Sequence, residues 1–177
     1  FAFLLCTACQ PEEVGVDRYV RLVNKAKTHL VETQEAQQYI YEAQFVPNSF
    51  QALKNTYRDD WSIEEIKEGL DQHLGHQYFS LHIRTITGKE VGAHLAENDR
   101  EAILNRLRFH AQKQFKAVIE KDTLPCVLYH MESNPITEKG IRLNLVFKDH
   151  IEQRSDFSDR VQLIFEDTYL SQERLNF

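Results

Sequence analysis

The chain is poor in the residues on which disulfide-bonded folds and phosphate-binding loops depend. Its 177 residues include three cysteines, six glycines and four prolines. Cys6 and Cys9 lie at the start of the sequence, so Cys126 is alone in the body of the chain. A disulfide framework is therefore excluded, and a hydrophobic core has to hold the domain together. With so few glycines, a phosphate site built from backbone amides is not expected either.

Positive charge and long apolar runs are also scarce. Asp and Glu number 27 against 21 Lys and Arg, and the net charge of −6 argues against nucleic-acid binding. No apolar run approaches the ~18 residues of a membrane-spanning helix. Hydrophobic residues make up 42% of the chain and charged residues 27%, which is typical of a single globular domain.

Named catalytic and cofactor signatures are missing from the sequence. It contains no P-loop and no G-x-S-x-G, H-E-x-x-H or G-x-G-x-x-G motif. We therefore predict no cofactor, and an enzyme is the less favoured class. Cys126, inside an apolar stretch, is most simply a buried small hydrophobic residue. The alternative is a catalytic thiol, for which the sequence offers no activating group.

The first ten residues carry the most informative pattern. Apolar residues fill positions 1–5, and the small residues Thr7 and Ala8 directly precede Cys9. This arrangement resembles the bacterial lipobox at the end of a secretory signal peptide, although Cys6 stands where Leu is usual. The resemblance implies that Cys9 is lipidated and becomes the new N-terminus. Two alternatives remain, a C-x-x-C redox or metal motif and an ordinary apolar strand.

The same pattern divides the chain into three parts. We expect residues 1–8 to be a signal-peptide remnant and residues 9–17 to be the lipidated cysteine with a short tether, where Pro11 and Gly15 disfavour regular structure. Residues 18–177 are expected to form one α+β globular domain.

Alternation of apolar and polar residues predicts the strands of this domain. The clearest alternating segments are 39–46, 78–86, 123–131, 140–148 and 160–166, and 29–33 is a candidate hairpin partner. A helix is predicted over 99–121, because Leu104, Leu107, Ala111, Phe115 and Val118 recur every three or four residues. We therefore predict an α+β fold in which this long helix covers one face of a mostly antiparallel sheet of about five or six strands.

The uncovered face of that sheet is the candidate ligand surface. Tyr78, Ser80, His82 and Arg84 share one face of their strand, and His130 is a candidate on another strand. Polar and aromatic side chains on rigid strands suit ligand binding, but an ordinary solvated face has the same composition. His73 and His76 form a weaker candidate. Because Gly75 interrupts them and no carboxylate follows at a fixed spacing, we predict a solvated loop and no metal site.

Three further stretches resemble a family of uncharacterised lipoproteins from Bacteroidetes-type bacteria. They are Tyr41–Pro47, Gln77–Leu81 and Asp122–His130, of which the last is the most specific. The resemblance implies an outer-membrane lipoprotein without an assigned activity. Glu12 and Glu13, close behind Cys9, are similar to an acidic signal that sends such lipoproteins to the cell surface; the alternative is a plain tether facing the periplasm.

These observations favour a lipid-anchored, non-catalytic domain that binds an envelope protein or an extracellular ligand. An envelope enzyme with a site around His82, Arg84 and His130 is the second hypothesis. A structural subunit of an envelope assembly is the third, and an exposed apolar patch would favour it.

Overall fold

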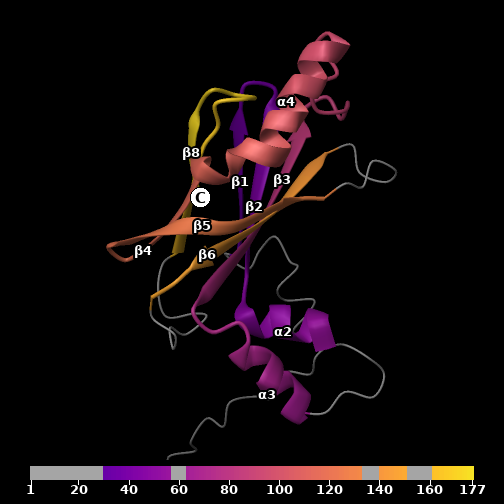
Figure 1. Ribbon diagram of the computed structural model, residues 1–177. Coiled ribbons are helices and arrows are strands. Elements are labelled where there is room, and N and C mark those ends of the chain that lie inside the picture. The colour runs from indigo at the N-terminus through magenta and orange to yellow at the C-terminus, as the bar shows by residue number, and fades with distance from the viewer. Residues whose placement is uncertain (1–29, 57–62, 133–139, 151–160) are drawn as a thin grey trace, which may run out of the picture.

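The strands and helices follow one another along the chain as Figure 1 shows. This computed structural model describes residues 30–56, 63–132, 140–150 and 161–177. The strands are β1 (Val31–Ala36), β2 (Tyr39–Val46), β3 (His76–Thr85), β4 (Phe115–Ile119), β5 (Asp122–Met131), β6 (Ile141–Lys148), β7 (Val161–Glu166) and β8 (Arg174–Asn176). The helices are α2 (Asn48–Thr56), α3 (Ile63–Asp71), α4 (Glu97–His110) and the 3₁₀ helix η1 (Ala111–Gln114).

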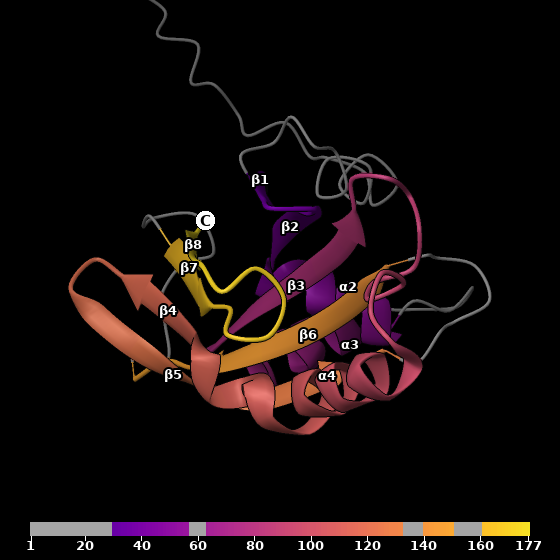
Figure 2. The ribbon, with the colours of Figure 1, turned by 90° about the horizontal axis from the view of Figure 1, so that it is seen from above.

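All eight strands belong to one antiparallel sheet that curls on itself. Their order is β1-β2-β3-β6-β5-β4-β7-β8, so the first and last strands of the described residues form the two edges. Seen from above, the sheet bends round until these edges approach each other (Figure 2). The Gln34 side chain spans the gap. Its amide group donates to the carbonyl of Asn176, and its carbonyl accepts from the Asn176 N–H at 3.4 Å.

The inside of the curled sheet is the hydrophobic core. Inward residues recur at every second position, as the alternation in the sequence requires. The largest fully buried side chains include Tyr41, Phe115, Phe147 and Phe165. The Phe115 and Phe165 rings stack 4.3 Å apart on the neighbouring strands β4 and β7. Side chains thus fill the interior, and the polar positions of the strands face outward.

A buried carboxylate ties the two ends of the sheet together. Asp167, 1% exposed, accepts a 2.5 Å hydrogen bond from the Tyr41 hydroxyl of β2. It also accepts bonds from the backbone N–H groups of Tyr169, Leu170 and Ser171 and from the Ser171 hydroxyl. The turn after β7 is thereby fastened to a strand at the other end of the sheet.

The predicted fold class is wrong, because the structure is mostly β. The sheet has eight strands rather than five or six, and it covers its own apolar face by curling. Its antiparallel pairing is as predicted. Among the described residues the helices are short, and none is long and apolar enough to cross a bilayer.

The long helix over 99–121 is also wrong. The α-helix ends at His110, η1 follows, and Phe115–Ile119 is strand β4. Phe115 fits the helical stripe, but Phe115, Ala117 and Ile119 also alternate with period two and are all buried. The β-branched Ile119 favours a strand, and pairing with β5 and β7 decides between the two patterns.

Candidate functional site

The five candidate ligand residues all lie on β3 or β5. On β3, Tyr78, Ser80, His82 and Arg84 alternate with the core residues and face outward. Cross-strand register places Ser80 beside Asn144, and Asn144 beside His130, across β3, β6 and β5. His82 lies beside Glu42 on one side and Arg142 on the other. The structure therefore places Ser80 and His130 on either side of Asn144, with Tyr78, His82 and Arg84 spread along β3.

Only part of this predicted surface is open to a ligand. Arg84 and His130 are exposed, but Ser80 is buried. The Nε2 atom of His82 is buried too, and it lies against Gly140. A Cβ atom on Gly140 would be 2.4 Å from it, far inside van der Waals contact. His82 thus packs directly against Gly140, just before β6. A residue with a Cβ atom at position 140 would not leave room for this imidazole.

Tyr78 belongs to a ring cluster at the lower end of β3. Its hydroxyl is 2.8 Å from Nδ1 of His73, and the two rings meet edge to face with centroids 5.3 Å apart. Desolvation, together with the nearby His76, lowers the pKa of His73, and burial raises the pKa of Tyr78. The predicted solvated loop is wrong for His73, which is buried. Nowhere in the described part of the chain do three metal-ligating side chains gather.

Cys126 is half-buried rather than fully buried. Its thiol donates to the carbonyl of Leu128 at 3.2 Å, and burial raises its pKa to about 11. A thiol with such a pKa is protonated at neutral pH, so it is a poor nucleophile. The geometry gives no support to a catalytic role.

A feature that the alternating pattern did not predict lies on β5. The register between β5 and β6 shifts between Cys126 and Leu128, so Val127 is an extra residue in a β-bulge. Val127 is 45% exposed and Leu128 54%. The sequence did carry a signal, because three consecutive apolar residues break the alternation there.

The end of α4 is fastened beside this bulge. The hydroxyl of Tyr129 donates to the carbonyl of Leu107, and the side-chain amide of Gln112 donates to the carbonyl of Cys126 at 2.9 Å. Along α4 and η1, the attachment points Leu107 and Gln112 enclose residues 108–111. Along β5, the attachment points Cys126 and Tyr129 enclose the bulge. Phe109, 67% exposed, lies between the attachment points Leu107 and Gln112.

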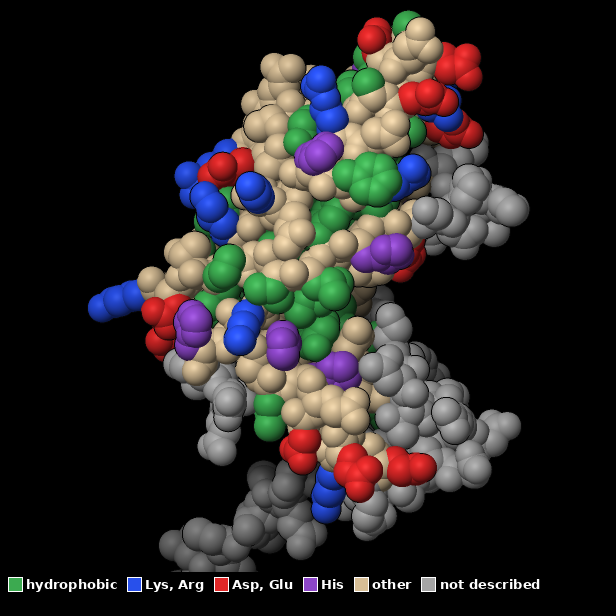
Figure 3. Space-filling model, viewed as in Figure 1, with side chains coloured by type: hydrophobic (Ala, Val, Ile, Leu, Met, Phe, Trp, Pro, Cys, Tyr) green, Lys and Arg blue, Asp and Glu red, His purple; other side chains and the backbone are tan. Residues whose placement is uncertain are grey.

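We call this surface the apolar–basic face. Its exposed apolar residues are Phe109, Val127 and Leu128, and its basic and imidazole side chains are Arg106, Arg108, His110, His130 and Lys148. Figure 3 shows hydrophobic side chains gathered in the middle of this view over β5 and β6, with histidines around them and acidic side chains towards the rim.

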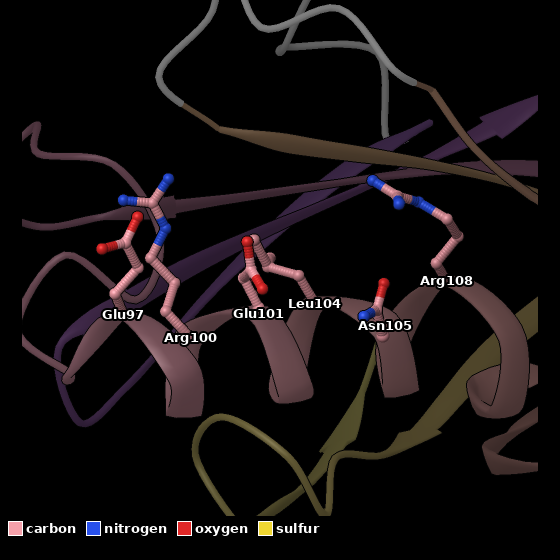
Figure 4. Close-up of a pocket in the computed structure, with 6 residues that line it drawn as sticks. All are labelled: Glu97, Arg100, Glu101, Leu104, Asn105 and Arg108. Atoms are coloured by element: carbon pink, nitrogen blue, oxygen red, sulfur yellow. The ribbon is translucent and has the colours of Figure 1, made fainter.

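A groove of about 300 Å³ runs along α4 (Figure 4). The described residues that line it are Glu97, Arg100, Glu101, Leu104, Asn105 and Arg108. Two carboxylates offset two guanidinium groups, and Arg100 already pairs with Glu90 at 3.2 Å. This charge balance marks the groove as a solvated helix flank and favours no ligand charge.

Comparison with known proteins gives no relative for this chain. No family model matches it, and no curated protein or solved structure is significantly similar. The lipoprotein resemblance therefore remains a prediction. Cys9, the remnant at 1–8 and the tether lie outside the described residues.

Proposed function

We propose that this chain is a lipid-anchored, non-catalytic binding domain of a bacterial cell envelope. The main support for a binding role on the outer surface is that the interior of the sheet is filled by side chains. Because large side chains such as Tyr41, Phe115 and Phe147 fill the inside of the sheet, binding has to take place on its outer surface. The apolar–basic face offers exposed apolar and cationic groups there, on a rigid antiparallel scaffold.

The anchor is proposed from the sequence pattern around Cys9. Each buried CH₂ of an acyl chain contributes roughly 0.8 kcal/mol, and stable attachment takes more than one chain. The modification implied by the lipobox carries several chains. The domain would then lie at the outer membrane, on the cell surface if the glutamates behind Cys9 act as an export signal, and otherwise in the periplasm.

Cell fractionation tests the anchor. A C-terminally tagged protein and its Cys9→Ser variant are expressed in the native host, and intact cells are treated with protease. The wild type is expected in the membrane fraction, and Cys9→Ser is expected to leave it. Loss of the tag from intact cells would indicate surface exposure, whereas protection would indicate the periplasm. Membrane retention of Cys9→Ser would refute the anchor.

No observation favours the enzyme hypothesis. Its candidate residues are spread along strands on the outside of the sheet, with Nε2 of His82 buried against Gly140. A catalytic site instead needs a base within hydrogen-bond reach of a reacting group. A structural subunit differs from a binding domain only in the permanence of its partner, and the exposed apolar residues are compatible with either.

A further inference from the structure

We infer that the apolar–basic face docks on an anionic phospholipid bilayer. The inference deepens the proposed function and rests on it in one respect, because an anchor at Cys9 would keep the domain near a membrane. The proposed partner of the outer surface is the headgroup region of the bilayer.

The apolar residues of the face protrude from it. The bulge in β5 adds Val127 to the outer side of a convex sheet, next to Leu128. On α4, Leu107 points into the core, and Phe109 lies about 200° further round the helix, which directs it to solvent. Protruding aliphatic and aromatic side chains are what a peripheral protein inserts at the headgroup boundary.

Within α4, which contributes to this face, the acidic residues lie in the N-terminal part, where Glu97 and Glu101 line the groove together with Arg108. Residues 103–119, 123–131 and 141–148 contain no Asp or Glu, in a chain whose net charge is −6. The carboxylate of Glu132, just beyond β5, pairs with Arg142 at 3.6 Å. The cationic side chains that remain around the apolar residues are Arg106, Arg108 and Lys148.

Phe109 lies next to two arginines on the surface of α4, an arrangement that suits a membrane interface. The guanidinium carbon of Arg108 lies 5.9 Å from the centroid of the Phe109 ring. Arg106 and Arg108 flank Phe109 on either side of the helix, since successive residues are about 100° apart. A ring that inserts between lipids would thus carry two cations at the level of the phosphate groups.

A bilayer suits this face better than a second copy of the chain. A two-fold dimer would bring Arg106, Arg108 and Lys148 against the same residues of the other copy, and like charges repel. A convex surface with separate protrusions needs no shape-matched partner when it meets a fluid lipid layer. A tether to the same membrane also raises the effective concentration, so weak docking is sufficient.

Vesicle co-flotation tests the inference without the anchor. The full 177-residue chain carrying Cys9→Ser, produced without lipidation, is mixed with vesicles of pure phosphatidylcholine or of phosphatidylcholine with phosphatidylglycerol. We expect binding to the anionic vesicles at least tenfold tighter than to the neutral ones. Binding should weaken as the salt concentration rises from 0.05 M to about 0.5 M, because salt screens exposed charges.

Two double variants separate the two parts of the face. Arg106→Gln with Arg108→Gln should weaken binding to anionic vesicles about 30-fold, since each basic residue near an anionic surface contributes roughly a fivefold factor. Phe109→Ser with Leu128→Ser should weaken it about tenfold or more. Ile86→Ser is the matched control, because Ile86 is 51% exposed in the turn after β3, away from this face. Equal thermal midpoints would show that all variants are folded.

Each outcome decides one question. No flotation with either vesicle would overturn the lipid inference and leave the face to an acidic protein partner. Equal loss in Ile86→Ser, or equal binding to neutral vesicles, would overturn it as well. None of these results touches the anchor, which depends on whether Cys9→Ser leaves the membrane in cells.

Discussion

At the scale of single residues, the carboxylate of Asp167 is buried and depends on hydrogen bonds from several donors. It accepts from the Tyr41 hydroxyl, from three backbone N–H groups and from the Ser171 hydroxyl. Burial and the adjacent carboxylate raise the pKa of Tyr41, so its hydroxyl stays a donor at all ordinary pH values. The bond from Tyr41 therefore stabilises a charge that has little access to water.

Removing that donor should destabilise the protein measurably. Tyr41→Phe keeps the ring in the core but leaves Asp167 short of one hydrogen bond, so we expect the free energy of unfolding to fall by about 1.5–3 kcal/mol. Chemical denaturation measures the change. The matched control is Tyr39→Phe, because Tyr39 is also buried as a residue and its hydroxyl accepts a 3.4 Å bond from Gln38. We expect that control to cost less than about 1 kcal/mol, and equal losses would contradict the role of Asp167.

Gly140 is a second residue whose identity the packing requires. Gly140→Ala would place a Cβ 2.4 Å from Nε2 of His82 and 2.7 Å from the carbonyl oxygen of Ile83. We expect a loss of about 1–3 kcal/mol in the free energy of unfolding, measured by denaturant titration. Adding His82→Ala should restore only part of the lost stability. It removes the clash with the imidazole, but the clash with the backbone of Ile83 remains. A variant as stable as the wild type would show that this approach is not tight in solution.

At the scale of elements, alternation in the sequence predicted the strands well. The predicted segments 39–46, 78–86, 140–148 and 160–166 agree with β2, β3, β6 and β7 to within two residues, because a half-buried strand leaves a two-residue period in its composition. The same reasoning failed at Phe115, which fits both a helical and a strand period. The strand wins there through pairing with β7, which is distant in sequence and therefore invisible in a local window.

The candidate site was less predictable than the strands, for a similar reason. The outward direction of Ser80 and His82 followed from alternation, but their burial depends on neighbouring segments. The three consecutive apolar residues at 126–128 mark an irregularity, but the identification of Val127 as the extra residue depends on the pairing with β6. The position of the end of α4 depends on Tyr129 of β5, which bonds to α4, and on Gln112 of η1, which bonds to β5.

The seam between β1 and β8 is not a paired strand ladder among the described residues. Only side chains bridge it in the described structure, and the Gln34 amide both donates to and accepts from the Asn176 backbone. Gln34→Ala should therefore lower the free energy of unfolding by roughly 1 kcal/mol and speed amide hydrogen exchange at Asn176. Thr33→Ala, at the neighbouring exposed position, is the control. Unchanged exchange at Asn176 would mean that the seam is held by other contacts.

At the scale of the whole molecule, the curled sheet separates stability from binding. Its interior holds the aromatic core, and its exterior holds the apolar–basic face, so substitutions on that face should spare the fold. Residues 103–119, 123–131 and 141–148, which carry this face, contain no Asp or Glu in a chain whose net charge is −6. The uneven charge gives the domain a direction in which to approach an anionic surface.

The stability of the whole molecule should also depend on pH through His73. Burial and the nearby His76 lower the pKa of His73 below its ordinary value of 6.5. In the unfolded chain this imidazole binds a proton near pH 6.5, whereas the folded protein binds it only at lower pH. The unfolded state therefore holds more protons in this range, and the stability contributed by neutral His73 is lost as the pH falls below 6.5.

Thermal unfolding between pH 7.5 and pH 5 measures this dependence. The wild-type midpoint should fall as the pH drops, and His73→Gln should flatten the profile, because glutamine retains hydrogen-bonding capacity towards Tyr78 but does not titrate. His130→Gln, at an exposed position, is the matched control. If both variants kept the wild-type slope, the acid sensitivity would lie elsewhere. If His73→Gln alone flattened it, the ring cluster at the end of β3 would be the group that couples protonation to unfolding.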